Sequence, residues 1–229
     1  RASFRGLGHI AGIGLPITIS LAVEMWAFQA STLMAGNLGE AELAAHTLVF
    51  NFIALIFMVP LGLGLASSVR VGNLIGDGDP RGAQRTAWVA HGIGAAFMGA
   101  ISLVLVAFPE AIPRAFTPDR HLITLGATLL PIAALFQICD GAQVISAGIL
   151  RGMGRTRMPA FAHALGFYAL GLPLAWWLLH HPEGEPGKLT DIWWGLAIGL
   201  LVVSSVLVAW VHLRGPASLE REQSDQPAA

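Results

Sequence analysis

Two acidic side chains, Glu24 and Asp140, lie deep inside long apolar stretches of this sequence. A carboxylate near the middle of a bilayer costs roughly 2.5–3.5 kcal/mol on insertion scales, so intramembrane acids tend to mark ion pathways. In such surroundings a carboxylate can carry a proton or be neutralised by a bound cation such as Na+. We therefore predict that Glu24 and Asp140 form a cation-binding pair for H+ or Na+. The alternative is a purely structural hydrogen bond to a hydroxyl on a neighbouring helix.

Further polar and aromatic side chains accompany the two acids. Residues three or four apart share one face of a helix, and both acids have polar or aromatic neighbours at that spacing. Separately, the amide of Asn51 interrupts the apolar run of the second predicted span. The candidates to line a cavity beside the acids are Phe28, Ser31, Asn51, Phe136, Gln137 and Gln143. Core packing is the competing interpretation, because buried aromatics are more often core than ligand contacts and a lone amide often makes an interhelical hydrogen bond.

The composition predicts that the bilayer surrounds this chain. Of the 229 residues only 12% are charged and 55% are hydrophobic, whereas a soluble domain is roughly 25% charged. The formal net charge of -1 supplies no basic stripe for a nucleic acid, which excludes that class of partner. No nucleophile motif such as Gly-x-Ser-x-Gly and no His-Glu-x-x-His occurs, and Cys139 is the single cysteine. We expect neither an enzyme nor a cofactor.

Six stretches are long and apolar enough to cross a membrane, since a spanning helix needs about 20 such residues. Four of them are built on runs without any charged residue, 43–69, 86–109, 158–182 and 192–213, and the other two are each interrupted by one of the two acids. The predicted spans are 10–36, 43–70, 86–108, 122–149, 158–180 and 192–213. The fold class is therefore an all-α membrane protein, with one six-span bundle over 1–214 and a polar cytoplasmic tail over 215–229.

The distribution of basic residues predicts that both termini are cytoplasmic, because Lys and Arg are retained on that side during insertion. With the N-terminus inside, ten basic residues face the cytoplasm and three face outward. The outward three are Arg114, Arg120 and Lys188, and the inward ten are Arg1, Arg5, Arg70, Arg81, Arg85, Arg151, Arg155, Arg157, Arg214 and Arg221. We interpret Arg151, at the end of the fourth span, as a side chain that reaches out of the membrane.

Pairs of small residues four apart recur along the spans and predict close contacts between helices. Such contacts need no functional explanation. The pairs are Gly8/Gly12, Gly62/Ala66, Gly92/Ala96, Gly148/Gly152 and Gly195/Gly199.

A series of short runs resembles the second half of the multidrug and toxic compound extrusion (MATE) transporters. Together the runs cover most of 6–180 in the expected order. They are Gly-Leu-Pro at 14–16, Met-Ala-Gly-Asn-Leu-Gly at 34–39, Leu-Ala-Ala-His at 43–46, Pro-Leu-Gly at 60–62, Ala-Ser-Ser-Val-Arg-Val-Gly at 66–72, Gln-Val-Ile-Ser-Ala-Gly-Ile-Leu-Arg-Gly-Met-Gly at 143–154 and Gly-Leu-Pro at 171–173.

The resemblance implies a secondary antiporter of the bacterial inner membrane that exports cationic or amphiphilic compounds in exchange for Na+ or H+. Members have two six-helix bundles around a central cavity, so this chain, which starts with Arg1, is expected to be a fragment that holds the C-terminal bundle. Its partners would be the lipid bilayer, small organic cations and the missing N-terminal bundle, on the same or a partner chain. Glu24 and Asp140 match the family's acidic cation-binding positions.

Two other functions remain open at this stage. A lipid-linked precursor flippase of the same superfamily would favour a basic cavity, and we predict no Lys or Arg mid-membrane, which argues against it. A non-transporting membrane scaffold subunit would use the six spans only for packing.

Overall fold

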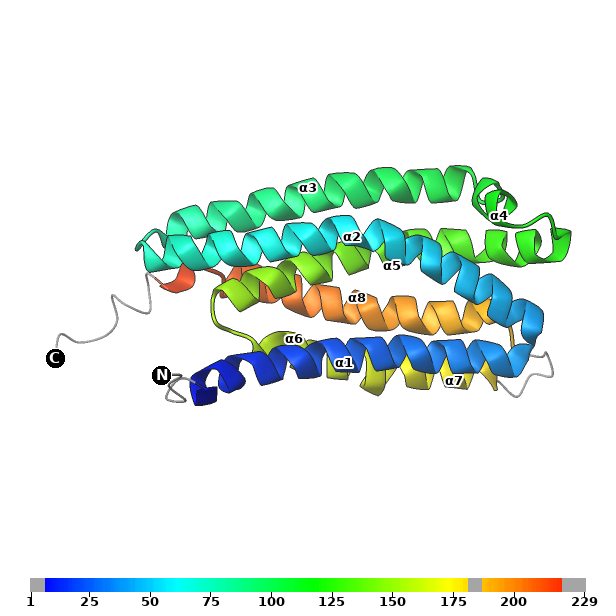
Figure 1. Ribbon diagram of the computed structural model, residues 1–229, viewed down its shortest axis with the longest axis horizontal. Helices are drawn as coiled ribbons and strands as arrows, with labels where there is room; N and C mark the ends of the chain where they lie inside the picture. Colours follow the sequence, from blue (N-terminus) through cyan, green and yellow to red (C-terminus); the bar gives the residue numbers. More distant parts are fainter. Residues whose placement is uncertain (1–6, 181–186, 220–229) are drawn as a thin grey trace, which may run out of the picture.

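The computed structural model describes residues 7–180 and 187–219, and these form an elongated helical bundle (Figure 1). Within these ranges six helical segments are long and apolar enough to cross a membrane, which confirms the predicted fold class. The elements are α1 Leu7–Leu38, α2 Glu40–Gly76, α3 Pro80–Ala107, the short α4 Ala111–Phe116, α5 Arg120–Gly152, α6 Arg157–His163, the π-helix η2 Ala164–Gly171, α7 Leu172–Leu179 and α8 Leu189–Leu213. Because α6, η2 and α7 together make the fifth crossing, α1 begins at the same end of the bundle at which α8 ends.

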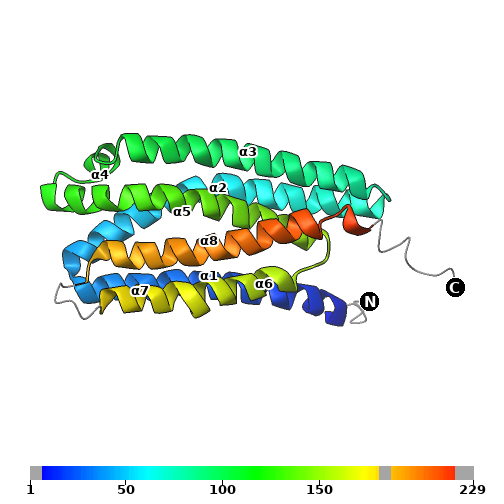
Figure 2. The same cartoon turned by 180° about the vertical axis from the view of Figure 1, so that it is seen from behind.

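Helix α5 is the centre of the bundle. Figures 1 and 2 show α3 along one edge, α1 with α6 and α7 along the other, and α2, α5 and α8 between them. Helix α5 packs against α2, α3 and α8, and most of its residues from 129 to 150 are buried. Side chains on several faces of α5 are therefore enclosed by other helices.

Glycines bring the backbones of α2 and α5 into contact. A Cβ atom added at Gly148 would lie 2.1 Å from the carbonyl oxygen of Gly64, and one added at Gly152 would lie 2.5 Å from that of Ser68. Such approaches leave no space for a side chain. The α5 residues around 140–147 are thereby held at a fixed depth beside α2.

The packing interpretation of the small-residue pairs is correct for only part of the set. Gly195 and Gly199 contact the fifth crossing in the same way as Gly148 and Gly152 contact α2. The pairs that begin at residues 8, 62 and 92 are different, because a Cβ added at Gly8, Gly12, Gly62 or Gly92 meets nothing within 4 Å. Spacing alone does not tell which face of a helix is covered.

The fifth crossing contains one irregular stretch. The π-helix η2 follows directly after His163, the last residue of α6, and Pro173 then begins the regular turns of α7. A π turn is wider than an α turn and shifts the side chains on either side of it. His163 and Phe167 both face inward and are nearly inaccessible.

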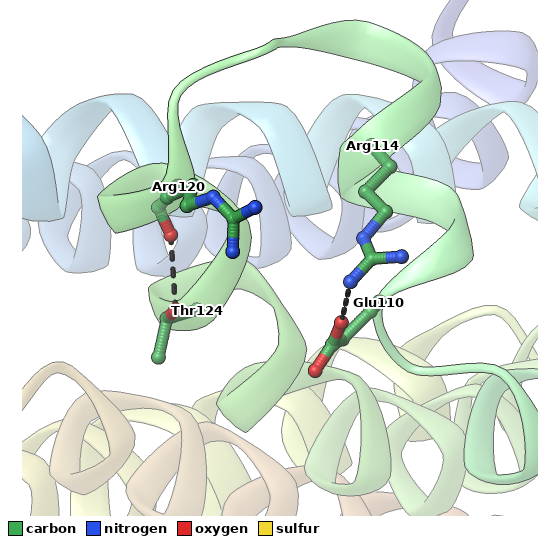
Figure 3. A network of polar contacts seen from close by, with 4 residues as sticks. All are labelled: Glu110, Arg114, Arg120 and Thr124. Carbon is green, nitrogen blue, oxygen red and sulfur yellow. Dashed lines mark hydrogen bonds and ion pairs between the residues drawn. The ribbon is translucent and has the colours of Figure 1, made fainter.

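The connection that carries α4 forms a polar end of the bundle. Glu110 and Arg114 make an exposed ion pair, and the Thr124 hydroxyl donates to the Arg120 carbonyl oxygen over 2.9 Å (Figure 3). These residues surround an open hollow of about 420 Å³. Its charges are solvated, so it contrasts with the enclosed acids described below.

At the opposite end, the chain after α8 turns back onto α3. Gly215 and Pro216 are buried, and the Ala217 N–H donates to the Gln84 side-chain oxygen over 3.4 Å. The start of the expected 215–229 tail is thus docked, while 220–229 lie outside the described residues. Arg1, Arg5 and Arg221, used in the orientation argument, also lie outside them.

We expect Gly148→Ala to destabilise the protein, because the added methyl group overlaps the Gly64 carbonyl oxygen. Overpacking of this kind costs about 1–3 kcal/mol. The measurement is the thermal unfolding temperature of the detergent-purified full-length protein. Gly62→Ala is the matched control on α2, because its methyl group meets open space. An unchanged unfolding temperature for Gly148→Ala would contradict the α2–α5 contact.

Candidate functional site

Both predicted acids lie at one cavity of about 370 Å³. Its walls come from α1, α2 and α5, with one residue from α6. Twelve of the described lining residues are apolar: Leu21, Met25, Phe28, Phe50, Ile53, Ala54, Phe57, Met58, Leu61, Phe136, Val144 and Ala147. The other five carry a polar or charged group: Glu24, Asp140, Gln143, Arg151 and His163. The cavity is a largely apolar chamber with its ionisable groups gathered on α1, α5 and α6.

The amide of Gln143 joins the two acids. Its Nε2 donates to Glu24 Oε1 over 2.7 Å and to Asp140 Oδ1 over 3.2 Å. Asp140 is 6% exposed and Gln143 is 1% exposed, whereas Glu24 is half-buried. The two acids are 116 positions apart in the sequence, yet one side chain serves both. The structure therefore brings Glu24 and Asp140 into one hydrogen-bonded site.

His163 and Ser20 extend this network on its other side. His163 Nε2 lies 2.8 Å from the Gln143 Oε1 atom, and His163 Nδ1 lies 2.9 Å from the Ser20 hydroxyl oxygen. Because the Gln143 oxygen can only accept, Nε2 donates to it in this arrangement. His163 Nδ1 faces both the hydroxyl oxygen of Ser20 and, at 3.3 Å, the Ser20 carbonyl oxygen. All three side chains are buried. The network runs from α1 through α6 and α5 and back to Glu24 on α1.

Arg151 corrects the sequence interpretation. Its side chain lines the cavity, and its Nε atom is buried without a hydrogen-bond partner among the described residues. The cause is geometric, because helix side chains point toward the N-terminus of their helix. From position 151 the chain therefore extends back over the small Ala147 toward the acids rather than outward. A basic group therefore lines this cavity, although Arg151 stands at the end of its span.

Phe28 closes the cavity beside the acids. Its ring lies 5.3 Å from that of Phe50, 5.9 Å from Phe136 and 5.5 Å from Phe167, all measured between centroids. These rings come from α2, α5 and η2, so Phe28 on α1 contacts three other elements. Tilted and edge-to-face pairs of this kind are the favoured aromatic geometry. Phe28 and Phe136 thus both pack in the core and line the cavity.

Three predicted cavity residues point elsewhere. Ser31 is buried and donates to the Phe28 carbonyl oxygen on its own helix, over 2.7 Å. Gln137 is buried against α2, where its Nε2 lies 3.4 Å from the Ile53 carbonyl oxygen. Asn51 is exposed on the surface of α2. None of the three lines this cavity. Ser31 lies two turns along α1 from Glu24, Gln137 is turned toward α2, and Asn51 faces the surface of α2.

Sequence reasoning missed His163 and Arg151 as members of the site. A usable signal existed for His163, since an ionisable side chain inside a predicted span is a candidate functional residue by default. Arg151 gave no such signal, because it stands at the end of its span next to Gly152. Only the three-dimensional arrangement shows that both side chains turn toward Glu24 and Asp140.

Comparison with known proteins identifies the family of this bundle. The MatE family model matches residues 16–177. The chain is 43% identical over 215 residues to the multidrug resistance protein NorM of Burkholderia vietnamiensis, which covers 91% of this chain and 46% of that protein. It is 41% identical over 219 residues to the probable multidrug resistance protein NorM of Burkholderia mallei, covering 93% and 46%.

A solved structure agrees in fold. That of the eukaryotic MATE transporter AtDTX14 matches with a TM-score of 0.85 at 23% identity, over 96% of this chain and 50% of that one. The chain spans about half the length of the curated relatives it matches. Its six long apolar helices make it a multi-pass membrane protein, and the family model and relatives together show that the chain belongs to the MatE family.

Proposed function

We propose that this chain is the C-terminal bundle of an ion-coupled antiporter that exports cationic or amphiphilic compounds. The observation that carries the proposal is the cavity in which Glu24 and Asp140 share the Gln143 amide at one side of an apolar chamber. Such a chamber suits a molecule with an apolar body and a positive charge. Membership in a family with multidrug resistance relatives supports the same conclusion. The family and its multidrug resistance relatives support a transporter rather than an enzyme.

Charge balance supplies a coupling mechanism. With both acids ionised, the cavity holds two carboxylates against the single Arg151 guanidinium and attracts a cation. When a coupling ion, H+ or Na+, neutralises one carboxylate, the attraction for a cationic substrate falls. A ligand shifts a conformational equilibrium only by its differential affinity for the two states. Ion occupancy therefore favours a state with lower substrate affinity and releases the substrate.

Flexible side chains at the cavity rim fit a range of substrates. Met25 on α1 and Met58 on α2 both line the cavity and are 62% and 54% exposed. Methionine is unbranched and polarisable, so it adapts to ligands of different shape. We place the missing N-terminal bundle over this side of α1 and α2, where it would complete the central cavity. The bundle would lie in the bacterial inner membrane with both termini cytoplasmic.

The positive charge of Arg151 bears on one alternative function, a lipid-linked precursor flippase. Such a substrate carries phosphates and requires a basic chamber. Here one guanidinium faces two carboxylates, so the balance of charge favours a cation over an anionic lipid. A scaffold subunit would leave unexplained why two acids are held in an apolar cavity.

Neutralising either acid should abolish transport in the full-length protein. We expect Glu24→Gln and Asp140→Asn each to lose ion-driven efflux of a fluorescent organic cation from cells, at expression equal to wild type, because the carboxylate charge that exchanges the ion is gone. Glu110→Gln is the control, since Glu110 lies in the exposed ion pair at the α4 end. Undiminished efflux in both acid variants would exclude the antiporter assignment, and raised stability with intact function would favour the scaffold.

Cysteine labelling tests the proposed orientation. In the full-length protein we expect Arg114→Cys, on α4, to react with a membrane-impermeant maleimide in intact spheroplasts. Asp77→Cys, in the exposed turn after α2, should react only after lysis. Cys139 is 5% exposed and serves as the unreactive background. The reverse labelling pattern would place both termini outside.

A further inference from the structure

A second groove lies between α2 and α3, near the end of the bundle where the short turn 77–79 joins these two helices (Figure 1). It has a volume of about 390 Å³, and its described lining comes from α2 and α3 alone. The lining includes two guanidinium groups, Arg70 of α2 and Arg85 of α3, and no acidic side chain. None of these residues lines the cavity that holds Glu24 and Asp140. The groove is therefore a separate feature with a net positive charge.

The charged and apolar parts of this groove lie at different depths. Arg70 stands seven residues after Leu63 on α2, and Arg85 stands eight residues before Ile93 on the antiparallel α3. A helix rises 1.5 Å per residue, so both arginines are displaced by about 10–12 Å from these apolar residues toward the joined end. The groove has a cationic end near the turn and an apolar end toward the middle of the bundle.

Both guanidinium groups are available to a ligand. Arg70 and Arg85 are exposed, and neither forms an ion pair within the part of the chain that the structure describes. The two hydroxyls in the lining are already used. Ser67 and Thr86 each donate to a carbonyl oxygen one turn earlier on their own helix, over 2.7 Å and 3.0 Å. Recognition of a ligand by this groove therefore depends on the two positive charges.

The groove faces away from the main cavity. Arg70 is nine residues from the cavity residue Leu61, which is about two and a half helical turns and places it on the opposite side of α2. We have placed the missing N-terminal bundle over the cavity side, so the groove side is left facing lipid. Its residues Val89 and Ile93 are 60% and 52% exposed, as suits contact with an acyl chain.

We propose that this groove binds an anionic phospholipid of the surrounding membrane. Its phosphate would contact Arg70 and Arg85, and one acyl chain would lie along Leu63, Val89 and Ile93. Basic pockets between membrane helices bind anionic headgroups, and a guanidinium donates several N–H groups to phosphate oxygens. A free phosphate ion shares the headgroup chemistry but would leave the apolar end of the groove uncovered. The proposed orientation places this lipid in the cytoplasmic leaflet.

The test is native mass spectrometry of the full-length protein in detergent, titrated with phosphatidylglycerol or with zwitterionic phosphatidylcholine. We expect phosphatidylglycerol to bind more tightly, because only its headgroup carries a net negative charge. Arg70→Gln and Arg85→Gln should each weaken its binding about fivefold, the effect of one basic residue on an anionic lipid. Arg81→Gln is the matched control, since Arg81 is exposed at the same end but does not line the groove.

A second comparison examines the apolar end of the groove. Ala66→Phe adds a ring at an exposed lining position of α2 and leaves the charge unchanged. We expect this variant to bind phosphatidylglycerol more weakly than wild type, because the ring takes the space of the acyl chain. Inorganic phosphate at the same concentration as the lipid should displace none of it from wild type.

Contrary results are specific to this site. Equal affinity for the two lipids, or equal losses in Arg81→Gln and in the two groove variants, would overturn the lipid site. Displacement of the lipid by inorganic phosphate would indicate a site for free anions instead. The acidic residues of 220–229 are the rival occupant from the chain itself. If wild type binds phosphatidylglycerol only after 220–229 are deleted, that segment fills the groove and the proposal is wrong.

The outcome is independent of the proposed transport function. Lipid binding is measured without a substrate or an ion gradient, and none of the substituted residues lines the Glu24–Asp140 cavity. A protein that fails to export cations would therefore still test the lipid site. An efflux-competent protein with no preference for the anionic lipid would contradict only this inference.

Discussion

The bridging amide of Gln143 is the interaction on which the site depends. Two carboxylates at one largely apolar cavity repel each other and cost free energy to bury, so a donor supplied by the protein stabilises them. One Gln143 nitrogen serves both, over 2.7 Å and 3.2 Å, only if α1 and α5 stay in register. The glycine contacts of α5 with α2 fix the depth of α5, and the ring of Phe28 fixes that of α1 against its neighbours. Packing far from the acids therefore determines whether the bridge can form.

The sequence predicts the six crossings well, because the signal is the length of each uncharged run and membrane solvation leaves few alternatives to a helix. It also singles out Glu24 and Asp140 as the acids inside predicted spans, because the free-energy cost of inserting an acid follows from its position in the span. The partners are a different matter. Whether Gln143 or Gln137 faces Glu24 depends on the rotation of α5 about its axis, and tertiary contacts determine that rotation. Both amides lie three residues from Asp140, yet only Gln143 joins the site.

The same limit explains Asn51 and His163. Asn51 interrupts an apolar run, as an intramembrane ligand would, but α2 turns it to the surface. His163 stands in a fifth span that contains no acid, so helical spacing within that span offers it no partner. Arg151 depends on the direction of a helix side chain rather than on its position. In each case the missing information is an angle, which one sequence does not contain.

The network also connects the charge state of the site to the attachment of α1. The fully buried residues of α1 are small ones, Ser20, Ala27, Ser31 and Ala35, so this helix contributes little buried apolar area compared with α5. Polar contacts with the rest of the bundle matter more for it, namely Ser20 to His163, Glu24 to Gln143 and the Val23 carbonyl oxygen to the Tyr168 hydroxyl. Neutralising Glu24 weakens one of these contacts directly. Helix α1 also forms one wall of the chamber. In the proposed antiporter, an ion bound at the acids would therefore act directly on the helix that encloses the substrate, and the coupling would need no longer pathway.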